Sequence, residues 1–315
     1  MVKREQNSVD SSVQTGGSIE GGEGPAFTLS LPASSPLPIL ISVPHAGRDY
    51  PEPVINRMRQ PDAASIRLED RYVDLLAAEV ARLTGAALII AVAPRAMLDL
   101  NRAREDMDWG MVAGENRDFP RHSQANRRAR SGLGLIPRRL PGFGEIWKGR
   151  ITARELEARI EGIHRPYHAA IAQQMERIRD EWGAALLVDF HSMPPLRQRL
   201  DELRPPSIVL GDRFGASCDS SLVFRAIRYL DLHGVASAHN RPYSGGYVLD
   251  RHAVPARGLH AMQLEVCRST YLDSQMIMPG DGISAMAEMI AGLVRELGAA
   301  TAQLAQSGGV AQAAE

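Results

Sequence analysis

The sequence predicts an α/β fold with a mostly parallel central sheet flanked by helices. Short apolar runs rich in β-branched residues alternate with amphipathic segments of helical period, the pattern of strands joined through helical crossovers. Hydrophobic residues make up 44% of the 315 residues and charged residues 23%, a balance typical of globular proteins. No internal repeat or linker is evident, so we expect one α/β domain.

Five apolar runs are predicted strands, and three amphipathic segments are predicted helices. The strands are expected at 38–43, 86–92, 184–190, 207–210 and 260–266, and the helices at 69–83, 152–182 and 283–297. Thr152 followed by Glu155 is typical of a capping box at the start of the long helix. The irregular stretch from about 103 to 150 is expected to form a loop or flap insertion.

The two ends of the chain are expected to be flexible. Residues 1–24 are rich in Gln, Ser, Gly and Glu and have no periodicity, so burial cannot offset the entropy of ordering them. Alanine dominates the apolar content of 299–315, and we expect this stretch to be a fraying tail after the last helix. The domain itself is therefore expected at 25–298.

Composition and charge argue against several classes of protein. Lys and Arg number 36 against 37 Asp and Glu, so no overall charge favours a polyanion. The longest apolar run, 86–93, is far shorter than the roughly 20 residues of a membrane span, and the first residues lack the apolar segment of an export signal. Two cysteines are too few for a disulfide framework. We expect a soluble cytoplasmic protein, and we allow for a homo-oligomer.

The insertion is rich in arginine, with seven of them between residues 117 and 139. A nucleic-acid arm is one interpretation, but Phe119 is the one ring among them that could stack on a base. A flap over a site for an anionic small molecule explains the same arginines. We therefore expect a small anionic substrate, with no nucleic acid and no membrane as partner.

Two histidines follow predicted strands directly. His45 comes just after the strand 38–43, and His191 ends the run that begins at 184. Ligands of open α/β sheets bind at the carboxyl ends of the strands. Zinc in catalytic sites is often held by two histidines and a carboxylate, and Glu69 or Asp70 could supply the acid. Both acids would also suit the first turn of a helix, so spacing does not choose between them.

Two further acids lie on the predicted strands. Asp189 precedes His191 by two residues, so it shares a face with that histidine and could orient it. Glu265 ends an apolar strand, where a buried carboxylate needs a partner or a proton. Beside a metal and a water it could act as a general base. The alternative is a structural ion pair of Glu265 with Arg268 or Arg251.

Two donor-rich segments complete the set of candidate residues. Residues 99–102 carry Asn101 and Arg102, and the forked guanidinium of an arginine suits a carboxylate. The loop 239–247 contains two adjacent glycines that permit close backbone approach to a ligand. Solvated surface loops are the alternative interpretation of both. His164 and His168, four residues apart in the long helix, are expected to serve packing and capping.

Several of these motifs occur in an order that resembles the N-formylglutamate amidohydrolase family over about residues 38 to 273. The motifs are Val43-Pro44-His45-Ala46-Gly47, Glu69-Asp70, Asp99-Leu100-Asn101-Arg102, Gly132-Leu133-Gly134 with Ile136-Pro137-Arg138, Pro166-Tyr167-His168, Asp189-Phe190-His191-Ser192, Gly245-Gly246-Tyr247 and Gln263-Leu264-Glu265. The resemblance implies a phosphorylase/hydrolase-like three-layer α/β fold, similar to the zinc carboxypeptidases. It also implies hydrolysis of a linear amide with one Zn²⁺ per chain.

The resemblance further implies a role for each site residue. The implied metal ligands are His45, Asp70 and His191. The carboxypeptidases carry the acid three residues after the first histidine, where this chain has Arg48, so Asp70 is the inferred acid and Glu69 the alternative. The implied catalytic residues are Glu265 as base and Arg102 at the oxyanion. The implied substrate-binding residues are Asn101, Arg241, Tyr247 and Arg251.

The implied substrate is N-formyl-L-glutamate, cleaved to L-glutamate and formate. Two alternatives stay open at this point. The chain could hydrolyse another N-acyl amino acid or a small peptide, or it could be a noncatalytic protein that binds a carboxylate or a metal.

Overall fold

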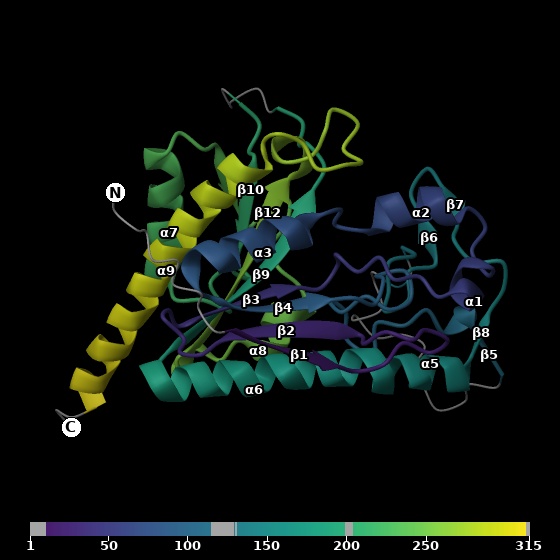
Figure 1. The fold of residues 1–315 in the computed structure, drawn as a ribbon, viewed down its shortest axis with the longest axis horizontal. Helices are drawn as coiled ribbons and strands as arrows, with labels where there is room; N and C mark the ends of the chain where they lie inside the picture. Colours follow the sequence, from purple (N-terminus) through teal and green to yellow (C-terminus); the bar gives the residue numbers. More distant parts are fainter. Residues whose placement is uncertain (1–10, 115–128, 130, 199–203, 313–315) are drawn as a thin grey trace, which may run out of the picture.

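An eight-stranded sheet forms the centre of the fold (Figure 1). A computed structural model describes residues 11–114, 129, 131–198 and 204–312. In sheet order the strands are β1 (Ser11–Gly16), β2 (Phe27–Pro32), β4 (Ala87–Ala91), β3 (Ile39–Val43), β9 (Ala185–Met193), β12 (Leu259–Cys267), β10 (Ile208–Gly211) and β11 (Ser237–His239). The predicted strands correspond to β3, β4, β9, β10 and β12.

The four central strands, β4, β3, β9 and β12, run parallel to one another, as predicted. The sheet as a whole is mixed, because β2 is antiparallel to β4 and β10 is antiparallel to β12. Every residue of β9 and β12 is buried, as expected for strands covered on both faces. The register pairs His191 with Glu265, so the strand ends that carry these two side chains are adjacent.

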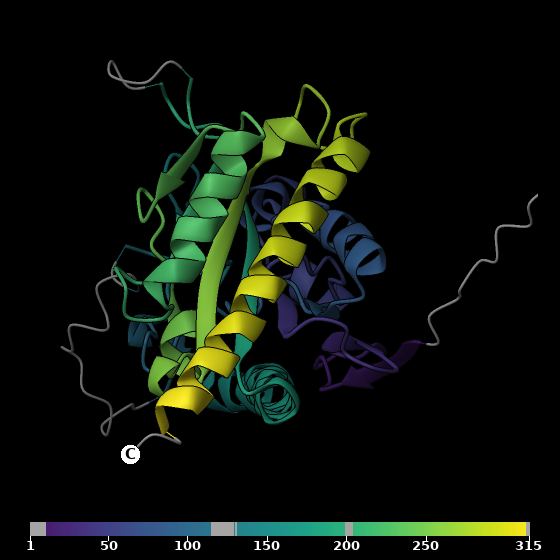
Figure 2. The same ribbon diagram turned by 90° about the vertical axis from the view of Figure 1, so that its left-hand side faces the viewer.

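Helices cover both faces of the sheet (Figures 1 and 2). The helices are α1 (Glu52–Ile55), α2 (Pro61–Leu68), α3 (Val73–Thr84), α5 (Ala153–Arg159), α6 (Arg165–Trp182), α7 (Ser220–Leu232), α8 (Tyr247–His252) and α9 (Ile283–Gln312). On one face α9 packs against α3 and α7, and on the other α6 and α8 contact the central strands. The predicted α/β architecture with a large sheet between helices is confirmed.

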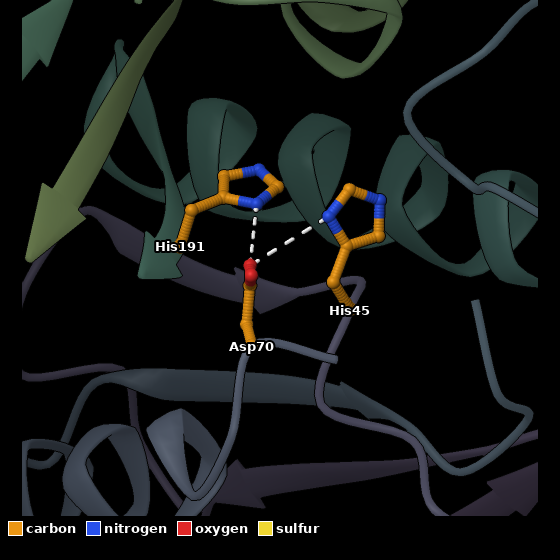
Figure 3. Close-up of side chains that lie close together, drawn as sticks. All are labelled: His45, Asp70 and His191. Carbon is orange, nitrogen blue, oxygen red and sulfur yellow. Dashed lines mark hydrogen bonds and ion pairs between the residues drawn. The ribbon is translucent and has the colours of Figure 1, made fainter. Parts of the chain in front are cut away.

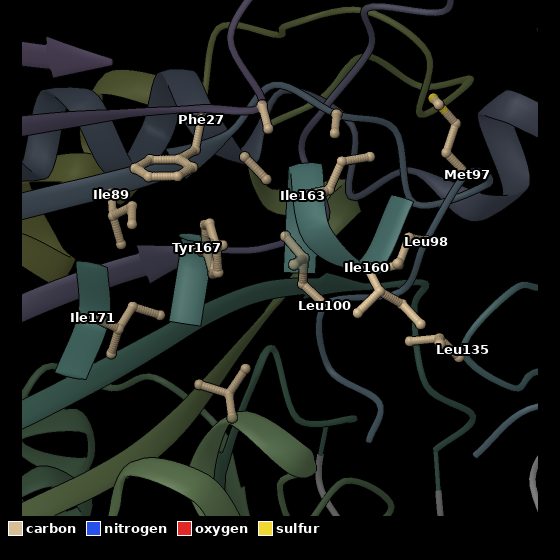
Figure 4. Packing of buried hydrophobic residues seen from close by; sticks show 14 of the residues in the cluster. Phe27, Ile89, Met97, Leu98, Leu100, Leu135, Ile160, Ile163, Tyr167 and Ile171 are labelled. Atoms are coloured by element: carbon tan, nitrogen blue, oxygen red, sulfur yellow. The ribbon is translucent and has the colours of Figure 1, made fainter. Parts of the chain in front are cut away.

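The long predicted helix is continuous but changes its pitch. A π-helical turn, Ile160–His164, joins α5 to α6, and the predicted capping box of Thr152 and Glu155 is present at its start. Figure 4 shows Ile160, Ile163 and Tyr167 from this helix packed with residues of the sheet and of the segment after β4. The second core, between the sheet and the α3, α7 and α9 layer, takes the alternate side chains of the same strands.

The chain ends are more ordered than expected. Within the stretch expected to be floppy, β1 pairs along its whole length with β2, because an edge strand is held by backbone hydrogen bonds and needs little apolar content. Within 299–315, α9 continues to Gln312, and Ala300 and Thr301 are buried. Both expectations of a flexible tail are corrected for these residues. Residues 1–10 and 313–315 lie outside the described residues.

Two other boundaries also differ from the prediction. The helix expected from residue 69 begins at Val73, and Glu69, the C-cap of α2, is extended. The insertion forms two small sheets: β6 (Arg139–Leu140) pairs with β7 (Gly144–Glu145), and β5 (Val112–Ala113) pairs with β8 (Ile151–Thr152), which follows the insertion directly. Five of its seven arginines, at 117, 121, 127, 128 and 130, lie outside the described residues. No helix within 11–114, 129, 131–198 and 204–312 is long and apolar enough to cross a membrane.

Candidate metal centre

His45, Asp70 and His191 meet at the carboxyl edge of the sheet (Figure 3). All three are buried, and one ligand atom from each lies within 4.8 Å of the others. Oδ2 of Asp70 is 3.0 Å from Nδ1 of His191 and 3.6 Å from Nδ1 of His45. Two imidazole nitrogens and one carboxylate oxygen therefore converge, and this donor set can hold a divalent metal ion.

The other ring nitrogen of each histidine is held by a buried carboxylate. Nε2 of His45 donates to Oδ1 of Asp99 at 2.7 Å, and Nε2 of His191 donates to Oδ2 of Asp189 at 2.8 Å. With Nε2 committed to these carboxylates, loss of the proton on Nδ1 makes the Nδ1 lone pair available to a ligand. This carboxylate–histidine arrangement is the usual second layer of metal sites.

Asp70 rather than Glu69 faces the two histidines. The backbone N–H of Asp70 donates to the carbonyl of His45 at 2.9 Å, which fixes the acid beside the end of β3. Glu69 instead pairs with Arg71 at 2.8 Å. Because the two acids lie in a connection between α2 and α3 and not in a helical turn, they point to different partners. Of the alternatives left open by the sequence, the geometry favours Asp70.

The electrostatics of the triad favour a positive charge at its centre. Burial alone lowers the pKa of His191, but the charge and hydrogen bond of Asp189 outweigh it and hold that pKa well above its ordinary value. Burial alone raises the pKa of Asp70, but its hydrogen bonds with His191 and His45 hold it below the ordinary value. A field that stabilises a proton on His191 also stabilises a metal cation, so the residues fit a metal.

A cavity of about 480 Å³ opens beside the triad. His45, Asp70 and His191 line it together with three other residues expected to act there, Asn101, Arg102 and Glu265. Glu265 comes from β12 and is 7% exposed. Its Oε1 accepts a 2.7 Å hydrogen bond from Nε2 of Gln263. Burial raises the pKa of Glu265 to about 7, opposed by the charge of His191 and assisted by that of Asp70, so this carboxyl can exchange a proton near neutrality.

Asn101 and Arg102 are fixed by several protein contacts. Arg102 donates from Nε to the carbonyl of Leu133 at 3.0 Å and from Nη1 to that of Asn101 at 2.8 Å. The side-chain oxygen of Asn101 accepts from the N–H of Val248 at 3.0 Å. A Cβ on Gly246 would lie 2.5 Å from that oxygen, so this glycine allows α8 to approach Asn101.

Three residues implied as substrate ligands are not among the residues that line this cavity in the described chain: Arg241, Tyr247 and Arg251. Tyr247 is the first residue of α8, a helix that the sequence did not predict, and its ring stacks on His164. Arg251 lies one turn later and donates to the Tyr247 hydroxyl at 3.0 Å. Arg241 is exposed. A role of these three residues in substrate binding stays a prediction.

The cavity also contains polar residues that the sequence did not assign to the substrate site, although Arg268 was a suggested ion-pair partner of Glu265 and Tyr243 belongs to the donor-rich loop 239–247. Tyr243, Arg67, Arg95 and Arg268 line it. Arg95 pairs with Asp99 at 2.9 Å, and its spacing of four residues before an acid was the available signal. Arg268 follows Glu265 by three residues and donates from Nε to Oγ of Ser192 at 3.1 Å. Arg67, on α2, carried no signal that separates it from an ordinary surface arginine.

Comparisons with known proteins identify the family of this chain. The family model for N-formylglutamate amidohydrolase matches residues 37–272. An N-formylglutamate deformylase of Pseudomonas putida is 31% identical over 240 residues, covering 75% of this chain and 82% of the relative. A second one, from Pseudomonas aeruginosa, is 29% identical over 264 residues, covering 83% of this chain and 91% of the relative.

Solved structures agree as well. The crystal structure of N-formylglutamate amidohydrolase from Ralstonia eutropha JMP134 superposes with a TM-score of 0.77 at 29% identity, covering 90% of this chain and 99% of that one. A gene product of Agrobacterium tumefaciens shares the fold at 17% identity, with a TM-score of 0.63, covering 87% and 95% of the two chains. The chain belongs to the N-formylglutamate amidohydrolase family.

Proposed function

We propose that this protein is a Zn²⁺-dependent amidohydrolase that cleaves N-formyl-L-glutamate to L-glutamate and formate. One observation carries the proposal: a buried His45–Asp70–His191 triad shares its cavity with the buried carboxyl of Glu265. The names of the relatives support the substrate. The His–acid–His donor set is also compatible with the similarity to zinc carboxypeptidases that the family resemblance implies.

The residues present fit zinc better than the harder cations. Two imidazoles with one carboxylate are a common protein donor set of catalytic zinc, whereas Mg²⁺ and Ca²⁺ prefer oxygen ligands. A bound Zn²⁺ supplies Lewis acidity and lowers the pKa of water in the site. His45, Asp70 and His191 would hold this ion, one per chain, and Asp99 and Asp189 would keep the two imidazoles in the ligating tautomer.

Glu265 is the proposed proton carrier. It removes a proton from water as the water oxygen attacks the formyl carbon, and a C–O bond forms. When the C–N bond breaks, the same proton passes to the amine nitrogen, which leaves as glutamate, and the formyl group leaves as formate. Burial of this carboxyl raises its pKa and so favours the protonated form that it must hold between the two transfers. The guanidinium of Arg102 stabilises negative charge on the carbonyl oxygen.

The cavity's charge supports an anionic small molecule as substrate. Four arginines and no lysine occur among its described lining residues, and forked guanidinium groups bind carboxylates well. We propose no nucleic-acid or membrane partner, because the sequence has no excess of positive charge. Hydrolysis of another N-acyl amino acid at the same centre is the second candidate function.

The test is formate release from N-formyl-L-glutamate by the wild type and by Glu265→Gln. We expect formate from the wild type and a rate at least 100-fold lower from the variant, because the amide keeps the shape of the carboxyl but cannot accept the proton. Zinc content should be equal in the two proteins. Formate release at the wild-type rate by Glu265→Gln would exclude the assigned base. N-acetyl-L-glutamate and N-formyl-L-methionine, run in parallel, separate the two candidate substrates.

A further inference from the structure

Four arginines line the cavity, and three of them are fixed by protein acceptors. Arg95 donates to Asp99, and Arg102 donates to two backbone carbonyls. Arg268 donates to Ser192 and, from Nη2, to the carbonyl of Glu69 at 2.6 Å. These contacts hold the three guanidinium groups in place around the triad.

Arg67 is different. Its guanidinium has no hydrogen-bond or ion-pair partner among the residues that the structure describes, yet it lines the same cavity. It lies over the ring of Phe143, with its Cζ 5.2 Å from the ring centroid, and Phe143 in turn packs on the apolar core. An aromatic ring beneath a guanidinium restrains its position while leaving the N–H groups of the fork available to a ligand.

The position of Arg67 is tied to that of the triad. It lies in the last turn of α2, three residues before Asp70. The chain is fixed at Asp70 by the backbone hydrogen bond to His45. Arg67 and the candidate metal ligand Asp70 therefore belong to one short, anchored segment. N-formyl-L-glutamate carries two carboxylates, one beside the scissile amide and one at the end of its side chain.

We propose that Arg67 binds the side-chain carboxylate of the substrate and so selects an N-formyl acidic amino acid over a neutral one. This inference rests on the function proposed above. We favour Arg67 for this contact over Arg241 and Arg251, which are not among the described residues that line the cavity. A forked donor facing a carboxylate makes a charge-assisted pair, and a neutral side chain at the same place would leave the guanidinium without that partner.

The test compares the steady-state kinetics of three variants on N-formyl-L-glutamate. In Arg67→Gln we expect KM to rise about 10- to 100-fold, the loss typical of a hydrogen bond to a charged group. The value of kcat should stay within threefold of the wild type, since the contact is present in both ground and transition states. Arg67→Lys keeps the positive charge but not the forked N–H groups. Its KM should lie between those of the wild type and Arg67→Gln.

The matched control is Arg82→Gln, which removes the same charge from an exposed position on α3 that does not line the cavity; its KM should stay at the wild-type value. A KM for Arg67→Gln within twofold of wild type would overturn the assignment of Arg67 and leave the proposed function standing. A fall in kcat at unchanged KM would overturn it too, by moving Arg67 into the chemical step. No formate from the wild type would refute the proposed function itself.

Discussion

Each histidine of the triad directs Nδ1 toward the candidate metal position and donates from Nε2 to a buried carboxylate. Asp189 accepts from Nε2 of His191 and also from Oγ of Ser42 at 3.0 Å. Oγ of Ser42 lies 3.1 Å from the Tyr167 hydroxyl of α6. A chain of buried polar groups therefore runs from the helix layer to the candidate metal centre, and it fixes the ring of His191 before any ligand arrives.

We predict that Asp189→Asn weakens zinc binding. The amide can still accept from His191, but it loses the negative charge that raises the basicity of the imidazole. The expected loss of zinc affinity is about 10- to 100-fold, measured by competition with a chromogenic chelator. Asp180→Asn is the control, because Asp180 is exposed on α6 and pairs with Arg179. Equal zinc affinity in Asp189→Asn and wild type would show that this carboxylate does not support the centre.

At the scale of elements, α6 holds the segment that carries Asn101 and Arg102. His168 donates from Nε2 to the carbonyl of Leu100 at 3.0 Å, and His164 donates from Nε2 to that of Arg102 at 2.9 Å. With its Nε2 proton in use, His168 accepts at Nδ1 from Nε2 of His252 at 3.0 Å. The sequence predicted packing and capping for His164 and His168. In the structure they connect the π-helical turn and α6 to this segment and to α8.

These three histidines favour the neutral form, and this has a consequence for stability. Burial lowers the pKa of His164, His168 and His252, the last to about 3. Below about pH 6.5 the unfolded chain binds protons that the folded chain excludes, so the stability they contribute is present above pH 6.5 and is lost as pH falls.

We predict that His168→Gln flattens this dependence. The amide of the introduced glutamine can still donate to the carbonyl of Leu100, but one titrating group is removed. Between pH 6 and 5 the free energy of unfolding of the variant should fall less steeply than that of the wild type, by up to about 1.4 kcal/mol per pH unit. Urea denaturation at a series of pH values measures it. Parallel curves for the two proteins would mean that His168 does not stay neutral in the folded state.

At the scale of the whole molecule, the sequence predicted the central strands, whose apolar side chains are buried on both faces of the sheet. The continuous apolar runs of β3, β9 and β12 placed three strands correctly, and the residues at their ends predicted that His45 and His191 would converge. It did not predict β1, because its pairing with β2 is made by the backbone and leaves no apolar pattern. The sequence could not choose Asp70 over Glu69, because the direction of each side chain depends on the backbone path between α2 and α3.

The substrate side of the cavity was the least predictable part of the molecule. Tyr247 and Arg251 belong to α8, and the turn of that helix directs them toward α6 and each other. Arg67 and Tyr243 reach the cavity from α2 and from the loop before α8. The positions of these side chains depend on tertiary packing, and the spacing of residues in the sequence does not predict them.

The central claim is that His45, Asp70 and His191 hold one zinc ion, and a pair of neighbouring variants tests it most directly. Zinc per chain is measured by elemental analysis after equilibration with Zn²⁺ and removal of the excess, for wild type, Asp70→Asn and Glu69→Gln. The account predicts one zinc in the wild type and in Glu69→Gln, and almost none in Asp70→Asn. Full zinc in Asp70→Asn, or no zinc in the wild type, would contradict it.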